Sequence, residues 1–206
     1  TLIFMVAGLY GGLFYAPTDY QQGESFRIIY VHVPAAWMSM FIYIVMAVSA
    51  AIGLIWRIKL ADIVAASSAP IGASFTFLAL ATGSLWGKPM WGAWWVWDAR
   101  LTSELVLLFL YMGFMGLHAA IDDQRNASRA TAVLAIVGVI NIPIIHFSVE
   151  WWNTLHQGVS DLSASNQGAN PPSVWVPAVL TGCGVIGLYL LAVILRTRNE
   201  ILRTEY

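Results

Sequence analysis

Charged side chains are scarce in this sequence. Asp, Glu, Lys and Arg make up 10% of its 206 residues and hydrophobic residues make up 59%, whereas a soluble domain carries about 25% charged residues. The formal net charge is −1 and the ten basic residues are scattered along the chain, so the concentrated basic patch of a nucleic-acid-binding protein is missing. We therefore expect a protein embedded in the lipid bilayer, with no nucleic acid among its partners.

Cysteine and nucleotide-binding motifs are also nearly absent. The single cysteine, Cys183, lies inside an apolar run, which excludes an intramolecular disulfide and any zinc or iron–sulfur site built from several cysteines. No Gly-x4-Gly-Lys-Ser/Thr pattern occurs, so an ATP-hydrolysing step would belong to another subunit. We expect Cys183 to be packed or lipid-facing, and we expect no ATPase activity in this chain.

Long apolar runs, by contrast, recur along the whole chain. A helix needs about 20 mostly apolar residues to cross the hydrocarbon core of a bilayer, and we assign six such spans. They cover residues 2–15, 34–56, 63–85, 102–121, 131–149 and 175–195. The sequence therefore predicts an all-α integral membrane protein in which residues 1–206 form a single domain of six transmembrane helices.

The first of these runs is short. It ends before Pro17 and would give about 21 Å of helix at 1.5 Å per residue, which is less than a full span. The basic stretch that opens a secretory signal peptide is missing in front of it. We therefore expect the chain to begin inside its first helix.

Basic residues orient the spans, because cytoplasmic loops carry an excess of Lys and Arg. One set of span ends holds seven basic residues and the other holds Arg27, Lys88 and Arg100. The seven are Arg57, Lys59, Arg125, Arg129, Arg196, Arg198 and Arg203. This distribution predicts that both termini are cytoplasmic and that three segments lie outside, namely residues 16–33, the segment 86–102 and a third outer loop at 150–174.

The outer segment 86–102 contains half of the ten tryptophans, in the stretch WGKPMWGAWWVWDARLT. Tryptophan is enriched wherever helices meet lipid headgroups, and this explains Trp56, Trp175 and the Trp151-Trp152 pair better than it explains five in one loop. If residues 91–98 are helical, indole rings and a carboxylate share one face. Such an aromatic platform in the outer interface would suit a large, flat, π-rich ligand such as a porphyrin.

Polar residues close this segment. Asp98 can cap the fourth span, and Arg100 can pair with Glu104 at i, i+4. We favour these local roles over direct ligand contact, although both stay open. Glu104 lies just inside a membrane helix, where an ionisable side chain is costly and is usually paired or functional.

Histidines are the only good candidates for transition-metal ligands. We place His32 at or just above the outer end of the second span, because Pro34 suits a first helical turn, and His156 in the third outer loop. His118 and His146 lie near opposite ends of their spans, about 20 Å apart in depth by helical rise. A mid-membrane pair of haem ligands, as in a b-type redox protein, is therefore disfavoured.

His32 and His156 share the outer face with the tryptophans, so they could bind a haem iron from opposite sides of the ring. A catalytic zinc needs three protein ligands, and only a doubtful third, His146, is available. The basic residues of this face, Arg27, Lys88 and Arg100, are candidate counter-charges for haem propionates. No Cys-x-x-Cys-His pattern is present, so thioether attachment is excluded.

The stretch WGKPMWGAWWVWDARLTSEL resembles the tryptophan-rich WWD signature of haem-handling membrane proteins in cytochrome c biogenesis. Six spans, a short chain and one flanking histidine in each of two outer loops are most similar to the CcmC family. The resemblance implies that haem b binds transiently at the periplasmic face of a bacterial inner membrane. It implies His32 and His156 as axial ligands, and a WWD site formed by Trp86, Trp91, Trp94, Trp95, Trp97 and Asp98.

The resemblance also implies a function and partners. Haem would pass to the periplasmic haem chaperone CcmE, which joins it covalently through its own histidine, with the small membrane protein CcmD and the ABC transporter subunits CcmA and CcmB as further partners. The chain would then be a handling protein that positions haem, and no enzyme. Two alternatives stay open: a haem-translocating permease subunit, which would place polar residues at mid-depth, and a membrane b-type redox protein.

Overall fold

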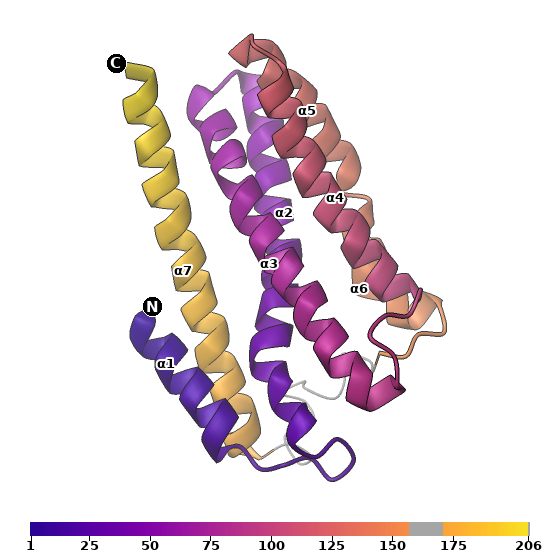
Figure 1. Cartoon of the computed structure of the whole chain (residues 1–206). Coiled ribbons are helices and arrows are strands. Elements are labelled where there is room, and N and C mark those ends of the chain that lie inside the picture. Colours follow the sequence, from indigo (N-terminus) through magenta and orange to yellow (C-terminus); the bar gives the residue numbers. More distant parts are fainter. Residues whose placement is uncertain (157–170, 206) are drawn as a thin grey trace.

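The computed structural model describes residues 1–156 and 171–205, and these form helices joined by short loops (Figure 1). An isolated β-bridge joins Asp19 to Gly23, and the described residues otherwise contain no β-strand. The elements in chain order are α1 (Leu2–Tyr10), the π-helix η1 (Gly11–Tyr15), the 3-10 helix η2 (Glu24–Ile28), α2 (Ile29–Trp56), α3 (Lys59–Trp91), α4 (Ala99–Ala120), α5 (Gln124–Gly138), α6 (Asn141–Trp151) and α7 (Pro172–Glu205).

The helices are those of a multi-pass membrane protein. Five segments of the described chain are long and apolar enough to cross a bilayer: Glu24–Trp56, Lys59–Trp91, Ala99–Ala120, Gln124–Trp151 and Pro172–Arg203. Leu2–Tyr15 is apolar but shorter. The all-helical membrane class is therefore confirmed, whereas the expected count of six spans is not.

Two helices extend further toward the tryptophan-rich end than the sequence predicts. The second span begins at Ile29, so Pro34 and His32 lie inside α2 and not at its start. The third span continues to Trp91, with Pro89 in its last turn, and ends where Gly92 adopts a φ of +76°. Glycine accepts this left-handed conformation without steric cost. A helical platform over residues 91–98 was therefore the wrong prediction, because residues 92–98 are irregular.

The fifth span is broken between α5 and α6. Pro143 has no N–H, so the Val139 carbonyl cannot receive the usual hydrogen bond from four residues later. The Ile142 N–H donates to that carbonyl at 2.9 Å instead. The Ile140 N–H likewise bonds three residues back, to Val137, and this tightened turn separates the two helices.

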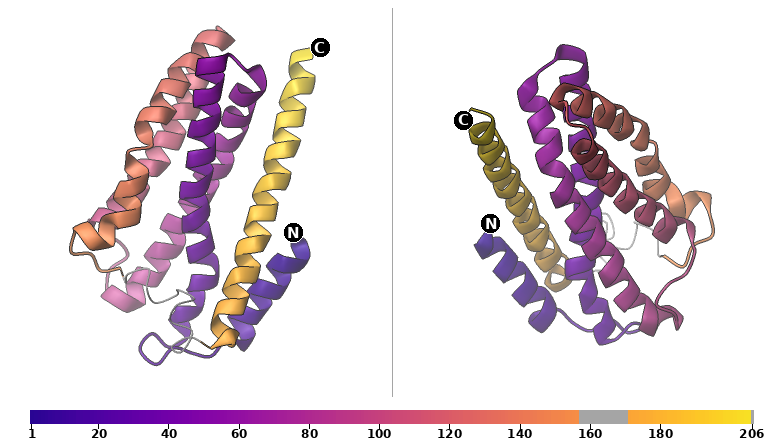
Figure 2. Two further views of the ribbon diagram at one scale, coloured as in Figure 1. Left: turned by 180° about the vertical axis from the view of Figure 1, so that it is seen from behind. Right: turned by 45° about the horizontal axis from the view of Figure 1, so that its top comes forward.

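The α2–α3 hairpin is the centre of the bundle. Helices α4, α5 and α6 pack on one side of it, and α7 with the short α1 packs on the other (Figures 1 and 2). The core between α2, α3 and α4 contains the rings of Tyr43 and Tyr111, which meet edge to face with centroids 5.1 Å apart. The Tyr111 hydroxyl donates to the Ser39 carbonyl at 2.8 Å.

Small residues allow close helix packing, as in other membrane bundles. Along α7, Gly184 receives Met5 and Gly187 receives Thr1, while Gly8 of α1 lies against Thr181. The two helices are antiparallel. Because α1 has only 9 residues and α7 has 34, α1 covers only the first half of α7.

Gly72 of α3 gives a test of this packing. A Cβ at this position would collide with the Tyr111 ring, so we expect Gly72→Ala to destabilise the protein by about 1–3 kcal/mol, the usual cost of overpacking. Gly116 on α4 is a matched control, because an added Cβ there meets nothing within 4 Å. Thermal unfolding in detergent should show a lower Tm for Gly72→Ala and an unchanged or higher Tm for Gly116→Ala.

Candidate functional site

His32 lies in the first turns of α2 and packs on α3. Its Nδ1 is 3.0 Å from the Thr82 hydroxyl. That hydroxyl donates its one hydrogen to the Leu78 carbonyl at 2.7 Å, so it accepts from the His32 Nδ1–H. The ring also meets Trp86 edge to face, with centroids 5.6 Å apart. Gly83 lies beneath the imidazole and leaves room for it, since a Cβ there would be 3.1 Å from Cε1.

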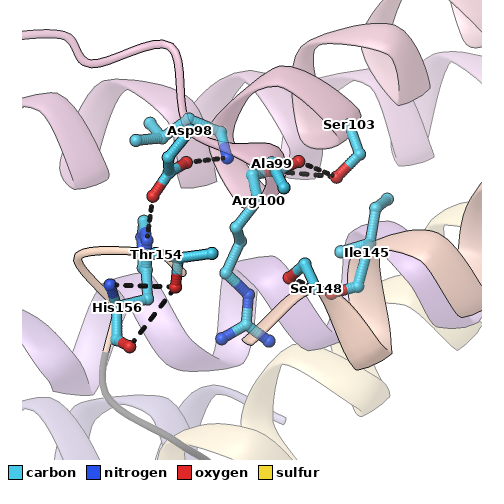
Figure 3. Close-up of polar contacts among 9 residues, drawn as sticks. Asp98, Ala99, Arg100, Ser103, Ile145, Ser148, Thr154 and His156 are labelled. Atoms are coloured by element: carbon cyan, nitrogen blue, oxygen red, sulfur yellow. Dashed lines mark hydrogen bonds and ion pairs between the residues drawn. The ribbon is translucent and has the colours of Figure 1, made fainter. Parts of the chain in front are cut away.

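His156 lies five residues beyond the end of α6 and is held by the loop that precedes α4. Its Nδ1 is 3.1 Å from Asp98 Oδ2, and its ring meets Trp91 edge to face at 5.0 Å (Figure 3). The backbone N–H of His156 donates to the Thr154 hydroxyl at 3.3 Å. His156 therefore packs on the same end of α3 as His32.

The two histidines form one site at the tryptophan-rich end of the bundle. Trp86 and Trp91, their ring partners, lie in the last two turns of α3. The two imidazoles are close enough to interact electrostatically with each other. In each ring Nδ1 bonds to a side chain, whereas no side chain within the described parts of the chain bonds to Nε2. The Ala79 backbone also interacts with the His32 ring. The same nitrogen is therefore left without a side-chain partner in both histidines.

Asp98 connects His156 to the first turn of α4. One carboxylate oxygen accepts from the Leu101 N–H at 2.8 Å and caps α4, as expected, and the other accepts from His156. Burial raises the pKa of Asp98, but the hydrogen bonds from His156 and Leu101 outweigh this effect and lower the pKa below its ordinary value. The carboxylate therefore stays ionised at neutral pH and fixes the proton of His156 on Nδ1.

The tryptophans surround this site without forming one flat helical face. Trp86 is held by a hydrogen bond from Nε1 to the Gln22 side chain at 3.0 Å. In the loop, Trp95 and Trp97 meet edge to face at 5.4 Å. Trp94 and Trp97 are 56% and 74% exposed, so an apolar ligand or partner could still cover them. The indoles thus form a wall on α3 and an exposed edge at Trp94 and Trp97.

Of the three basic residues at this end, Arg100 is the one whose charged group has no hydrogen-bond partner among the described residues. Arg27 pairs with Glu24 at 2.6 Å and donates to the Leu13 carbonyl at 2.8 Å. Lys88 donates to the Gly92 carbonyl at 3.1 Å. Arg100 is half-buried, and its carbonyl accepts from the Ser103 hydroxyl at 3.1 Å (Figure 3). Its guanidinium forms no hydrogen bond or ion pair within the described residues.

The expected ion pair between Arg100 and Glu104 is not formed, which corrects that prediction. The Glu104 carboxylate is buried and accepts from the Ser39 hydroxyl of α2 at 2.7 Å. It lies near enough to Arg100 for electrostatic attraction. Ser39 and Thr82 are the site residues that the sequence analysis missed, and a single hydroxyl on an apolar helix gives no signal of its role.

The other two histidines lie elsewhere. His118 is at the opposite end of the bundle, where its Nε2 is 3.2 Å from the Gln124 side chain. His146 packs on Phe147 in α6. Among the described residues no group of three His, Cys, Asp or Glu side chains could hold a metal ion, so nothing here favours the zinc alternative. Residues 157–170 of the predicted third outer loop lie outside the described residues.

Comparison with known proteins identifies the family. A family model described as "Heme exporter protein C" (CcmC) matches residues 1–206. "Heme exporter protein C" of Escherichia coli K12 is 55% identical over 205 residues, covering 100% of this chain and 82% of the relative. The Haemophilus influenzae protein of the same name is 50% identical, with 100% and 83% covered.

A more distant relative is the "Putative cytochrome c biosynthesis ccmC-like mitochondrial protein" of Marchantia polymorpha. It is 46% identical over 194 residues, which cover 94% of this chain and 82% of the relative. The match extends over the spans and the tryptophan-rich site together, as the resemblance predicted. The chain belongs to the heme exporter protein C family, a multi-pass membrane family that handles haem in cytochrome c biogenesis.

Proposed function

We propose that the chain holds haem between His32 and His156 at the outer face of the membrane and presents it to the periplasmic chaperone CcmE. The observation that carries this proposal is the matched chemistry of the two imidazoles. Iron-binding histidines use one ring nitrogen for the metal and hydrogen-bond the other to a carboxylate, a carbonyl or another acceptor. In both rings Nδ1 bonds to a side chain and Nε2 has no side-chain partner within the described residues.

The residues around the imidazoles fit haem as the cargo. Trp86 and Trp91 flank the two histidines and supply aromatic surface for the porphyrin. The Arg100 guanidinium, which lacks an ion-pair partner within the described residues, would bind a propionate. The exposed side chains of Trp94 and Trp97 would face the chaperone, so that one side of the ring stays accessible. Bound haem would supply the iron centre that His32 and His156 would hold.

The partners and orientation follow from the family and the charge distribution. Seven basic residues at the opposite end support a cytoplasmic location for that end. In a bacterial inner membrane the histidines would then face the periplasm. Because the chain has no ATP-binding motif, energy for a later release step would come from CcmA and CcmB. CcmD would complete the complex. The chain itself would act by positioning, which is the role of a carrier and not of an enzyme.

A transfer assay tests this function. The full chain, loaded with haem in detergent, is incubated with CcmE, and haem that stays on CcmE after denaturation is measured. We expect transfer from the wild type and none from a His32→Ala, His156→Ala variant. Equal loading of CcmE by free haem would contradict the proposal. Haem movement across proteoliposomes without CcmE would favour the permease alternative. Reduction of the bound haem by a quinol would favour the redox alternative.

Trp91 offers a separate test of the aromatic wall. We expect Trp91→Leu to weaken haem binding about tenfold, since loss of one aromatic contact costs about 0.5–1.5 kcal/mol beyond the lost area. Trp56 is the matched control, because it lies at the other end of α2 and is 65% exposed. Titration with haem should show unchanged affinity for Trp56→Leu. Equal weakening in both variants would reduce the Trp91 effect to general membrane anchoring.

A further inference from the structure

A second site lies at the opposite end of the bundle from the histidines. A cavity of about 890 Å³ opens there between the α2–α3 turn, α4, α5 and α7, and we call it the inner cavity. Its volume is in the range of known ligand pockets, about 300–1,000 Å³. Six basic side chains from separate parts of the chain line it: Arg57, Lys59, Arg125, Arg129, Arg196 and Arg203.

The positive charge of the inner cavity is largely unneutralised. Asp62 and Glu200 are the acidic residues of its lining. Arg203 approaches Glu200 at 3.9 Å, and the other five basic side chains form no ion pair within residues 1–156 and 171–205. These five are exposed at the rim, whereas the floor holds buried Ile63 and Ser67. The cavity thus combines exposed, unpaired basic side chains with a few buried residues, and this lining fits an anion.

The lining distinguishes between kinds of anion. Apart from His118, no described residue that lines the inner cavity is aromatic. A porphyrin would therefore find no stacking surface here, in contrast to the tryptophan-rich end. Several arginines around one space suit phosphate oxygens, which accept several charge-assisted hydrogen bonds. The inner cavity thus favours a phosphate group over haem.

The position of the cavity favours a lipid as the source of that phosphate. The residues just before Arg57, Ile55 and Trp56, are 64% and 65% exposed, and Ile194 and Leu195 before Arg196 are 62% and 47% exposed. These apolar side chains lie on membrane spans beside the basic rim. A phospholipid could therefore place its headgroup in the cavity and its acyl chains along α2 and α7.

We infer that the inner cavity binds the phosphate headgroup of an anionic phospholipid of the cytoplasmic leaflet. Basic pockets between membrane helices on this side recognise such headgroups. The bound lipid would bridge the α2–α3 turn and α5 to α7 and thereby hold α7 against the rest of the bundle. This inference is independent of the haem site, and it does not require the proposed function to be correct.

A lipid titration of the purified full chain tests the inference. Phosphatidylglycerol in mixed micelles is compared with phosphatidylcholine of the same acyl chains and with inorganic phosphate, and bound lipid and Tm are measured. We expect binding and a raised Tm with phosphatidylglycerol alone. Equal binding of phosphatidylcholine would overturn the inference, because the headgroup charge would then play no part. Saturation by millimolar inorganic phosphate would overturn the lipid as the source.

Neighbouring arginines of α7 provide matched variants. Arg196 lines the inner cavity and Arg198 does not. Each basic residue near a membrane contributes about a fivefold factor in affinity for anionic lipid. We therefore expect Arg196→Gln to weaken phosphatidylglycerol binding about fivefold, Arg125→Gln with Arg196→Gln about 30-fold, and Arg198→Gln hardly at all. Arg196→Lys should retain binding. Equal effects of Arg196→Gln and Arg198→Gln would show a diffuse charge effect and refute a defined site.

Discussion

Replacing His32 and His156 together by alanine is expected to leave the purified protein with less than about a tenth of the wild-type haem. The double variant removes both free Nε2 atoms, the proposed axial ligands, while the tryptophan wall stays in place. Loss of an outer-shell partner alone weakens a metal site by about 10- to 100-fold, so loss of both ligands should have a larger effect. Haem content and the absorbance spectrum of the purified full chain measure it.

The other two histidines are the matched controls. His118 bonds to Gln124 at the opposite end of the bundle and His146 packs on Phe147, so His118→Ala and His146→Ala should retain haem. The proposal fails if the His32, His156 double variant keeps full haem while either control loses it. That result would favour a b-type redox protein with ligands at another depth.

A single substitution by glycine separates loss of a ligand from loss of fold. His156→Gly leaves a space of imidazole size beside Asp98 and Trp91. We expect free imidazole in the buffer to restore part of the haem binding, because it can occupy that space and offer its own nitrogen. A misfolded variant would show no such rescue, and its helical circular dichroism would also change.

The end of the bundle at which the histidines meet could be predicted from the sequence. The order of the apolar spans predicts that His32 and the segment 86–102 lie at span ends on the same side of the membrane. The sequence also predicts that seven basic residues lie at the opposite set of span ends. Six of them line the inner cavity together, at the end of the bundle away from the histidines. The positions of the spans depend on the burial of apolar side chains and on the thickness of the bilayer. The lengths of the apolar runs in the sequence reflect both requirements.

Helix ends could not be predicted in the same way. Pro34 is typical of a first helical turn in an isolated sequence, yet it lies inside α2, and Pro89 lies inside α3. In a membrane a proline costs one backbone hydrogen bond, and neighbouring helices can compensate for it. The third apolar run ends at residue 85, whereas α3 continues for six more residues to Trp91. Hydropathy alone therefore did not show that this helix extends into the tryptophan-rich segment.

Side-chain pairing within the site could not be predicted from the sequence either. The i, i+4 spacing predicts an ion pair of Arg100 with Glu104. Instead, the Ser39 hydroxyl of the neighbouring α2 donates to the Glu104 carboxylate at 2.7 Å. Thr82 is similar, because its contact with His32 joins residues 50 positions apart. Such partners depend on how α2, α3 and α4 are rotated against one another. A single apolar sequence carries little information on that rotation.

Asp98→Ala is expected to weaken haem binding about 10- to 100-fold. The substitution removes the acceptor of the His156 Nδ1–H, so the imidazole loses the contact that fixes its tautomer and its orientation. It also removes the cap of α4, where Asp98 accepts from the Leu101 N–H at 2.8 Å. Loss of a cap costs about 1 kcal/mol. Haem titration and thermal unfolding of the same preparation measure the two effects separately.

Asp123→Ala isolates the contribution of the cap. Asp123 caps α5 by accepting from the Asn126 N–H at 2.8 Å, the same distance as in the Asp98 cap, but it lies at the other end of α4. Both variants should lose about 1 kcal/mol of stability, and only Asp98→Ala should lose haem affinity. Asp98→Asn should keep the cap and lose the charge, so its haem affinity should lie between wild type and Asp98→Ala. Equal haem affinity of Asp98→Ala and Asp123→Ala would mean that Asp98 only caps the helix.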